Sequence, residues 1–228
     1  MNLLSLTSIN DYVNSNVINK YKAKNQKGRT CYANAISASI CLSSAKVLGR
    51  PELNFYEIRK EWIDKYGVDG ADTFSALEEY LKNIKYKLHS REVNENRARN
   101  AIMKTRICVA RFYLTARQWG NFKKFFNNSP KDIITKEIIN EPFDYLDQID
   151  GGHAVVLTHI SKDYLKLLNS WGINWGDNGY FKVKNADVLN IKFREIFWGK
   201  NDLSRDEINY YNYYMNILEN EIKQSLFD

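Results

Sequence analysis

The first half of the chain carries apolar residues three and four positions apart. This spacing predicts helices over residues 31–48, 55–65 and 73–83. The first of them ends before Gly49, with Pro51 beyond it, and both residue types commonly follow a helix end. We therefore expect a helical lobe over about residues 22–95.

The second half carries short runs that are rich in β-branched and aromatic residues. These runs predict strands over residues 106–114, 153–160, 163–171 and 179–184. Apolar and polar residues alternate in YFKVK, which is typical of a half-buried antiparallel strand. We expect a sheet or barrel lobe over about residues 100–200, interrupted by a helix at 115–127 and a long loop at 130–150.

Composition and charge narrow the class of protein. The chain has 228 residues, of which 44% are hydrophobic and 26% charged, as in one large domain or two closely packed lobes. No stretch approaches the roughly 18 consecutive apolar residues of a membrane span, and the N-terminus lacks the regions of a secretion signal. The net charge of +6 is spread among acidic residues rather than gathered in a block, so nucleic acid is not favoured as a partner. We expect a soluble protein.

The three cysteines, Cys31, Cys41 and Cys108, are widely spaced, odd in number and form no CxxC pair. They predict neither a disulfide framework nor a zinc site, and no other cofactor is indicated. Such cysteines fit the cytoplasm or another reducing intracellular compartment, including one that the protein reaches by delivery into a host cell.

Cys31 begins the longest predicted helix. The free N–H groups and the dipole at a helix start stabilise a thiolate and lower its pKa, and Lys27 and Arg29 add positive charge nearby. However, free cysteines are also among the most buried residue types. Position alone therefore leaves open whether this cysteine is a core residue or a nucleophile.

A histidine at the start of a predicted strand can supply the base. His153 follows two glycines, which let a loop approach closely and place an imidazole at the edge of the sheet lobe. Asn169 ends the next strand-like run, where its amide can orient that imidazole, and Trp171 can shield their hydrogen bond from water. Together, Cys31, His153 and Asn169 indicate nucleophilic catalysis.

Three segments, TCYANAI, GGHAVVL and LLNSWGINWGDNGYFKV, resemble the catalytic blocks of the papain-like cysteine peptidases, in the same order. The segment GVDGADTFSALEEYL (67–81) is similar to the glycine-rich substrate-binding segment of that family and the helix after it. The resemblance covers about residues 22–185. It implies an α+β fold with an N-terminal helical lobe, a C-terminal antiparallel β-barrel-like lobe and an active-site cleft between them.

The resemblance also implies a role for individual residues. Cys31 would be the nucleophile, His153 the base and then the acid for the leaving group, and Asn169 the residue that orients the imidazole. Gln26 would stabilise the oxyanion together with the backbone N–H of Cys31. Gln26 stands one residue closer to the cysteine than is usual, so Asn25 is an alternative.

The resemblance implies a substrate-binding rim as well, in which Gly70 offers a bare backbone that pairs with an extended peptide. The expected substrate-binding residues are Asp69, Gly70, Gly152, Ala154 and Trp171. The sequence departs from the family in having Tyr32 in place of a Trp and Gly28 in place of a Cys, and in lacking the family's disulfides. Because 30 residues precede Cys31, we expect no inhibitory propeptide of the usual kind.

We expect a thiol hydrolase that cleaves peptide bonds through an acyl-enzyme, with a protein or peptide as its partner and no membrane or nucleic acid. One alternative is an intracellular isopeptidase or deubiquitinase that acts on ubiquitin-like modifiers. Another is a catalytically silent binding module on the same fold. The joint presence of Cys31, His153, Asn169 and Gln26 speaks against the silent module.

Two further segments lie outside the resemblance. Residues 137–150, just before the expected base, are rich in acidic residues, and form either a solvated loop or a rim that selects basic substrate residues. Their carboxylates belong to Glu137, Glu141, Asp144, Asp147 and Asp150. Residues 201–228 predict an amphipathic helix that packs on the protein's own body or on a partner, with Ser204 and Glu207 as a capping box. Its apolar stripe consists of Ile208, Tyr211, Met215, Leu218 and Ile222.

Overall fold

The computed structural model describes residues 22–47, 50–81, 87–104, 106–140, 149–210, 212–213 and 216. The first half contains helices α2 (Cys31–Ser44), α3 (Phe55–Tyr66) and α4 (Thr73–Leu81). These are the three helices that the apolar spacing predicts. Helix α2 is shorter than expected, because residues 45–47 already form a turn.

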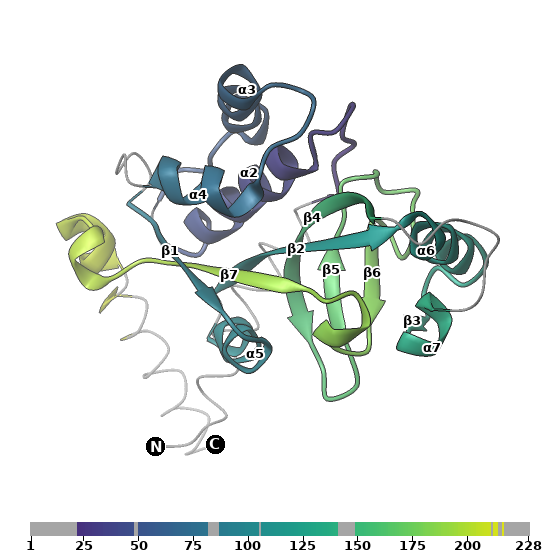
Figure 1. Ribbon diagram of the computed structural model, residues 1–228. Helices are drawn as coiled ribbons and strands as arrows, with labels where there is room; N and C mark the ends of the chain where they lie inside the picture. Colours follow the sequence, from purple (N-terminus) through teal and green to yellow (C-terminus); the bar gives the residue numbers. More distant parts are fainter. Residues whose placement is uncertain are drawn as a thin grey trace, which may run out of the picture.

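Helix α2 lies between the helices α3 and α4 and the sheet (Figure 1). Every residue from Tyr32 to Ser44 is buried. Most of these residues are alanines and serines, whose small side chains allow neighbouring elements to approach closely from several directions. A helix that is buried all round belongs to the centre of a protein rather than to its surface. The expected nucleophile therefore stands at the start of the most enclosed helix.

The strands form one seven-stranded sheet with the order β1-β7-β2-β4-β5-β6-β3. They are β1 (His89–Val93), β2 (Ile107–Thr115), β3 (Ile133–Ile134), β4 (Ile149–Ile160), β5 (Leu165–Leu168), β6 (Tyr180–Val183) and β7 (Lys192–Phe197). All neighbouring pairs are antiparallel except β3 and β6, which run parallel. The expected α+β class is confirmed, and each of the four predicted strands is present.

The sequence pattern misses strands β1 and β7 and helix α5 (Glu95–Met103). Strand β1 falls in the range expected to be helical, yet it pairs with β7 at the edge of the sheet. Only Val93 among its five residues is buried, so it carries no alternating apolar signal. In β7 the buried positions include Arg194 and Glu195, and their charges hide the strand pattern.

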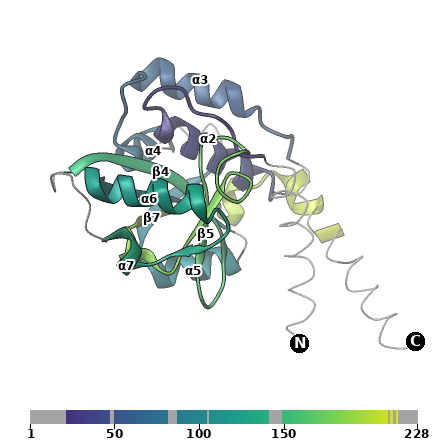
Figure 2. The same cartoon turned by 90° about the vertical axis from the view of Figure 1, so that its right-hand side faces the viewer.

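Alternate residues of β2 and β4 pack on opposite faces of the sheet. Val109 and Val156 join the core that contains α2, whereas Cys108 and Leu157 join a second core on the other face. Helix α5 and helix α6 (Ala116–Asn128) cover that second face, and Figure 2 shows α6 on the side of β4 opposite α2 and α3. Since side chains along a strand alternate between its faces, two strands separate two cores.

The expectation of a long loop over residues 130–150 is wrong in part. It contains β3, the short helix α7 (Lys136–Ile139) and the first residues of β4. These elements are too short to produce a recognisable period in the sequence. Glu137 lies in α7, and Asp150 is exposed on β4. Residues 141–148, with the other three acidic side chains of this stretch, lie outside the described residues, so their role in charge selection stays a prediction.

The C-terminal segment continues after two short 3₁₀ turns, Ala186–Val188 and Lys200–Asp202. Residues 205–210 are helical, and the predicted capping box is confirmed: the Glu207 N–H donates to Ser204 Oγ at 3.1 Å, and the Ser204 N–H donates to Glu207 Oε2 at 2.7 Å. Arg50 Nε donates to Glu207 Oε1 at 2.8 Å, which ties this helix start to the body. The stripe residues from Tyr211 onward lie outside the described residues.

Within the described part of the chain, no helix combines the length and the apolar character needed to cross a membrane.

Candidate active site

Cys31 is the first residue of α2 and is partly buried at the seam between the helices and the sheet. Burial raises the pKa of its thiol, although the backbone N–H groups of Ala154, Tyr32 and Cys31 itself act in the opposite direction. The sequence-based expectation of a lowered pKa is therefore wrong: the loss of hydration outweighs the helix-start donors.

Tyr32, which stands where the papain-like family has a Trp, holds the neighbouring loop in place. Its side chain is fully buried, and its hydroxyl donates to the carbonyl oxygen of Gly67 at 2.6 Å. The same loop is fixed to the segment before the nucleophile by the Arg29 N–H, which donates to the Val68 carbonyl at 3.1 Å. The loop that carries Asp69 and Gly70 is thereby anchored beside Cys31.

His153 lies on β4 with its imidazole almost completely buried, and Asn169 follows the end of β5. Asn169 Oδ1 accepts from the Ser170 N–H at 2.8 Å and lies 2.7 Å from His153 Nε2. The Ser170 bond fixes which end of the amide is the oxygen. Because an amide oxygen only accepts, Nε2 must carry the proton, and Nδ1 is then the nitrogen with a free lone pair.

Three aromatic rings surround the imidazole. The ring centroids of Trp171, Phe112 and Trp119 lie 5.0, 5.7 and 5.9 Å from that of His153. Burial among these rings lowers the pKa of His153 to about 4, against a smaller raising effect of the Asn169 hydrogen bond. The imidazole is thus neutral at neutral pH. Trp171 lies beside the imidazole, and its predicted role in shielding the hydrogen bond from water stays a prediction. Phe112 and Trp119 are missed by the sequence analysis because they belong to other elements.

Gln26 is joined to the residue that follows Asn169. Its backbone N–H donates to the Ser170 carbonyl at 2.7 Å, and its Oε1 accepts from Ser170 Oγ at 2.6 Å. Its Nε2 donates to the Gly28 carbonyl at 2.8 Å and keeps a second hydrogen. Asn25 is exposed and its side chain lies against Gly172. The geometry thus favours Gln26 over Asn25 as an oxyanion donor, although both remain candidates.

The expected substrate-binding residues lie on both sides of the seam. Asp69 and Gly70 are exposed on the helical side, and Gly70 has a positive φ of 102° that favours glycine. On the sheet side, Ala154 is buried and its backbone contacts the thiol, whereas Gly152 is exposed. The Tyr113 ring lies so close to Gly152 that any Cβ there would collide with it.

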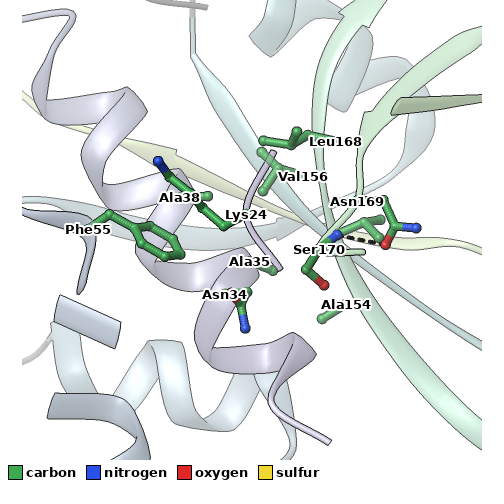
Figure 3. Close-up of a pocket in the computed structure, with 11 residues that line it drawn as sticks. Lys24, Asn34, Ala35, Ala38, Phe55, Ala154, Val156, Leu168, Asn169 and Ser170 are labelled. Carbon is green, nitrogen blue, oxygen red and sulfur yellow. Dashed lines mark hydrogen bonds between the residues drawn. The ribbon is translucent and has the colours of Figure 1, made fainter. Parts of the chain in front are cut away.

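A small cavity lies at the seam between the helices and the sheet, with a volume of about 10 Å³. Figure 3 shows Asn34 and Ala35 of α2 facing Ala154 and Ser170 across it. A cavity of that size holds about one water molecule. Close packing therefore fixes the position of the nucleophile helix relative to the strands that carry the imidazole and its partner.

The loop after Asn169 requires a glycine at position 179. Gly179 has a φ of +86°, and a Cβ there would collide with Ala23. Its carbonyl accepts from the Asn169 N–H at 2.9 Å. This explains the last glycine of NSWGINWGDNGY in physical terms, since a bare backbone lets Ala23 pack beside the residue that bonds to Asn169.

Among the residues that the structure describes, no group of three or more His, Cys, Asp and Glu is placed to hold a metal ion. Cys41 and Cys108 are buried, and burial raises the pKa of each thiol to about 12. Cys31 is therefore the most accessible of the three cysteines.

Comparisons with known proteins identify the family to which the chain belongs. The family model described as Papain family cysteine protease matches residues 76–194, which include His153 and Asn169 but not Cys31. An uncharacterized peptidase C1-like protein of Acanthamoeba polyphaga mimivirus is 33% identical over 79 residues, or 34% of this chain and 25% of that protein. Mexicain of Jacaratia mexicana is 53% identical over 34 residues, 15% of this chain and 16% of mexicain. The chain thus matches a quarter or less of the length of these relatives.

A solved structure shows the same fold over a longer range. The bromelain protease from Ananas comosus, in complex with the E64 inhibitor, aligns with a TM-score of 0.53 and 16% sequence identity. The alignment covers 78% of this chain and 94% of the bromelain chain.

Proposed function

The chain belongs to the papain family of cysteine proteases, and we propose that it is a thiol hydrolase that cleaves peptide bonds through a covalent acyl-enzyme. One observation carries the proposal. His153 Nε2 lies 2.7 Å from Asn169 Oδ1, whose orientation the Ser170 N–H fixes. This leaves Nδ1 as the basic nitrogen of a site that has a cysteine at the start of the facing helix.

In the proposed reaction, Nδ1 of His153 takes the proton from the Cys31 thiol as the sulfur attacks the carbonyl carbon of the peptide bond. The carbonyl electron pair moves to the oxygen and returns when the C–N bond breaks, and the imidazolium gives its proton to the departing amine. Water then attacks the thioester with His153 again as the base. The products are a carboxylic acid and the free thiol.

Two donors are proposed for the oxyanion of the tetrahedral intermediate, the backbone N–H of Cys31 and Nε2 of Gln26. Ser170 supports Gln26 in this role because its hydroxyl holds Oε1 and so sets the direction of the amide. A preorganised donor of this kind lowers the barrier by roughly 3 kcal/mol.

The ionisation of the free site supports proton transfer during attack rather than before it. Burial raises the pKa of the Cys31 thiol and lowers that of His153 to about 4, so both groups are neutral near pH 7. A neutral pair needs no separated charges in a poorly hydrated seam. The imidazole then acts as a general base at the moment the sulfur attacks.

We further propose that an extended peptide binds along the seam. Gly70 would pair with the peptide backbone from the helical side, next to Asp69, and Gly152 and Ala154 would border it from the sheet side. Trp171 would cover the imidazole on the side of the leaving group.

Active-site labelling tests the proposed function. E64, which the bromelain structure contains, should add once to the folded protein, and mass spectrometry should place the adduct on Cys31. Cys31→Ser is the negative control, and Cys41→Ala is the matched control that removes a buried thiol. Hydrolysis of fluorogenic peptides should be lost in the first variant and kept in the second.

The same assay separates the alternatives. Preferential labelling by an electrophile fused to a ubiquitin-like modifier, with no turnover of short peptides, would favour the isopeptidase. Peptide binding without labelling or turnover would identify a silent binding module and contradict the proposal.

A further inference from the structure

The face of the β2–β4 ladder that points toward the helical lobe becomes polar beside Cys31. Deeper in the seam this face presents Val109 opposite Val156, and both are buried. One step outward, Arg111 lies opposite Ala154, whose backbone contacts the thiol. A charged side chain thus stands across one strand from the residue next to the nucleophile.

Arg111 reaches from the sheet to the helical lobe. Its Nη1 donates to Oδ2 of Asp72, the residue before α4, and its guanidinium carbon lies 4.3 Å from the ring centroid of Phe74. The arginine side chain is 25% exposed and the aspartate 41%. The other oxygen of Asp72 already accepts from the Ser75 N–H at 2.9 Å. One carboxylate oxygen therefore serves a group with five N–H donors.

The remaining donors of Arg111 include one that is buried and has no acceptor. Nε of Arg111 has no hydrogen-bond partner among the described residues, although it is out of contact with solvent. Leaving a buried donor unpaired is unfavourable, and the penalty is larger for a charged group. A second anionic oxygen would reach the guanidinium where the 25% exposed side chain meets solvent, and arginine presents donors in a fork that matches a carboxylate.

The surroundings suit a side chain that ends in a carboxylate. Ala154 and Phe74 are both buried, and Phe74 lies against the guanidinium, so the apolar surface open to a methylene chain is that of the half-exposed Tyr113. The cationic group lies at the seam itself, where water is partly excluded and a charge-assisted hydrogen bond is stronger than on an open surface.

From these contacts we infer that Arg111 is a specificity-determining residue that selects peptides with an acidic side chain at the position beside Ala154. This inference rests on the proposed function, since it names the substrate class of the same seam. Asp72 holds the guanidinium in the free protein and competes with the substrate carboxylate for it.

The test uses pairs of fluorogenic peptides that differ only by Glu or Gln at one position next to the scissile bond. At one such position the wild-type protein should hydrolyse the Glu peptide about tenfold faster in kcat/KM, because a hydrogen bond to a charged group is partly desolvated there. Arg111→Gln should bring the ratio close to one. Arg97→Gln, which removes an exposed charge on α5, is the matched control and should leave the ratio unchanged.

A second variant keeps Arg111 in place, so its result does not depend on whether the protein folds without that side chain. Asp72→Asn keeps an oxygen for the Ser75 N–H but removes the competing charge, so the Glu/Gln ratio should rise above that of the wild type. Raising the salt concentration should lower the ratio in both proteins. An unchanged ratio in Asp72→Asn, or a wild-type ratio near one at every position, would overturn the inference and leave Arg111 as a structural bridge.

Binding measurements keep this inference separate from the proposed function. Fluorescence anisotropy with Cys31→Ser reports peptide binding without chemistry. Glu-selective binding that Arg111→Gln abolishes, together with no hydrolysis by the wild type, would reject the hydrolase and retain the inference. Hydrolysis at equal rates for Glu and Gln peptides would retain the hydrolase and reject the inference.

Discussion

The two faces of the β2–β4 ladder differ in chemistry although their residues alternate along the same strands. One face places Phe112 opposite His153 and is covered by the aromatic side chains of α6 and the loop after β5. The other places Arg111 opposite Ala154 and meets the helical lobe. The first, aromatic face excludes water from the imidazole of His153 and keeps it neutral. The second, polar face places the cation of Arg111 next to the seam. Because side chains alternate between the two faces, one pair of strands supplies the candidate base His153 on one face and the cation Arg111 on the other.

The largest expected effect comes from the aromatic face. His153→Gln keeps a similar volume but removes the base, so kcat/KM on a fluorogenic peptide should fall by about 10²- to 10⁴-fold. The melting temperature should stay within a few degrees of the wild type. His159→Gln on the same strand is the matched control and should keep full activity. Activity within tenfold of wild type in His153→Gln would show that this face does not carry the base.

The second prediction concerns stability against pH. The pKa of His153 is about 4 in the folded protein and about 6.5 in an unfolded chain. Between these values the unfolded state binds the additional proton, so the free energy of unfolding rises with pH, by about 3 kcal/mol over the window. As the pH falls from 6.5 to 4 this contribution is lost. Denaturant titrations of the wild type and His153→Gln should show a flatter dependence in the variant, and identical slopes would contradict a dry imidazole.

The third prediction concerns the thiol between the two faces. Because burial raises the pKa of Cys31, its alkylation by iodoacetamide should rise about tenfold per pH unit from pH 6 to 8, as expected when the thiolate is a small fraction. Peptide mapping should place the label on Cys31 and leave Cys41 and Cys108 unmodified in the folded protein. A rate that is flat over this range would instead indicate a preformed thiolate–imidazolium pair. Equal labelling of either buried cysteine would reject Cys31 as the reactive thiol.

The smallest expected effect is a loss of stability when either of two ion pairs is broken, one that is only structural and one on the polar face of the ladder. Asp72→Asn and Glu207→Gln each remove the carboxylate partner of an arginine, Arg111 in one case and Arg50 in the other. Each should cost about 1 kcal/mol or less, a fall in melting temperature of a few degrees. Only Asp72→Asn should change the Glu/Gln preference. A matching change in Glu207→Gln would mean that global stability, rather than the charge of Arg111, sets the preference.

The sequence by itself determined the elements with a strong period and the identity of the candidate catalytic residues. The spacing of apolar residues predicts α2, α3 and α4. The motifs around Cys31, His153 and Asn169 contain the residue types that nucleophilic catalysis requires. Such signals are local, and a single chain reveals them because neighbouring residues share one element.

Only the tertiary structure decided how these residues are surrounded. Phe112, Trp119 and Trp171 come from different elements, and their meeting around His153 sets its low pKa. Burial reversed the pKa shift that the helix start predicts for Cys31, since desolvation depends on every element packed against the sulfur. The position of Arg111 beside Ala154 follows from strand register, which pairs residues 43 positions apart. Register, burial and desolvation are sums over distant contacts, and a local pattern in the sequence does not contain them.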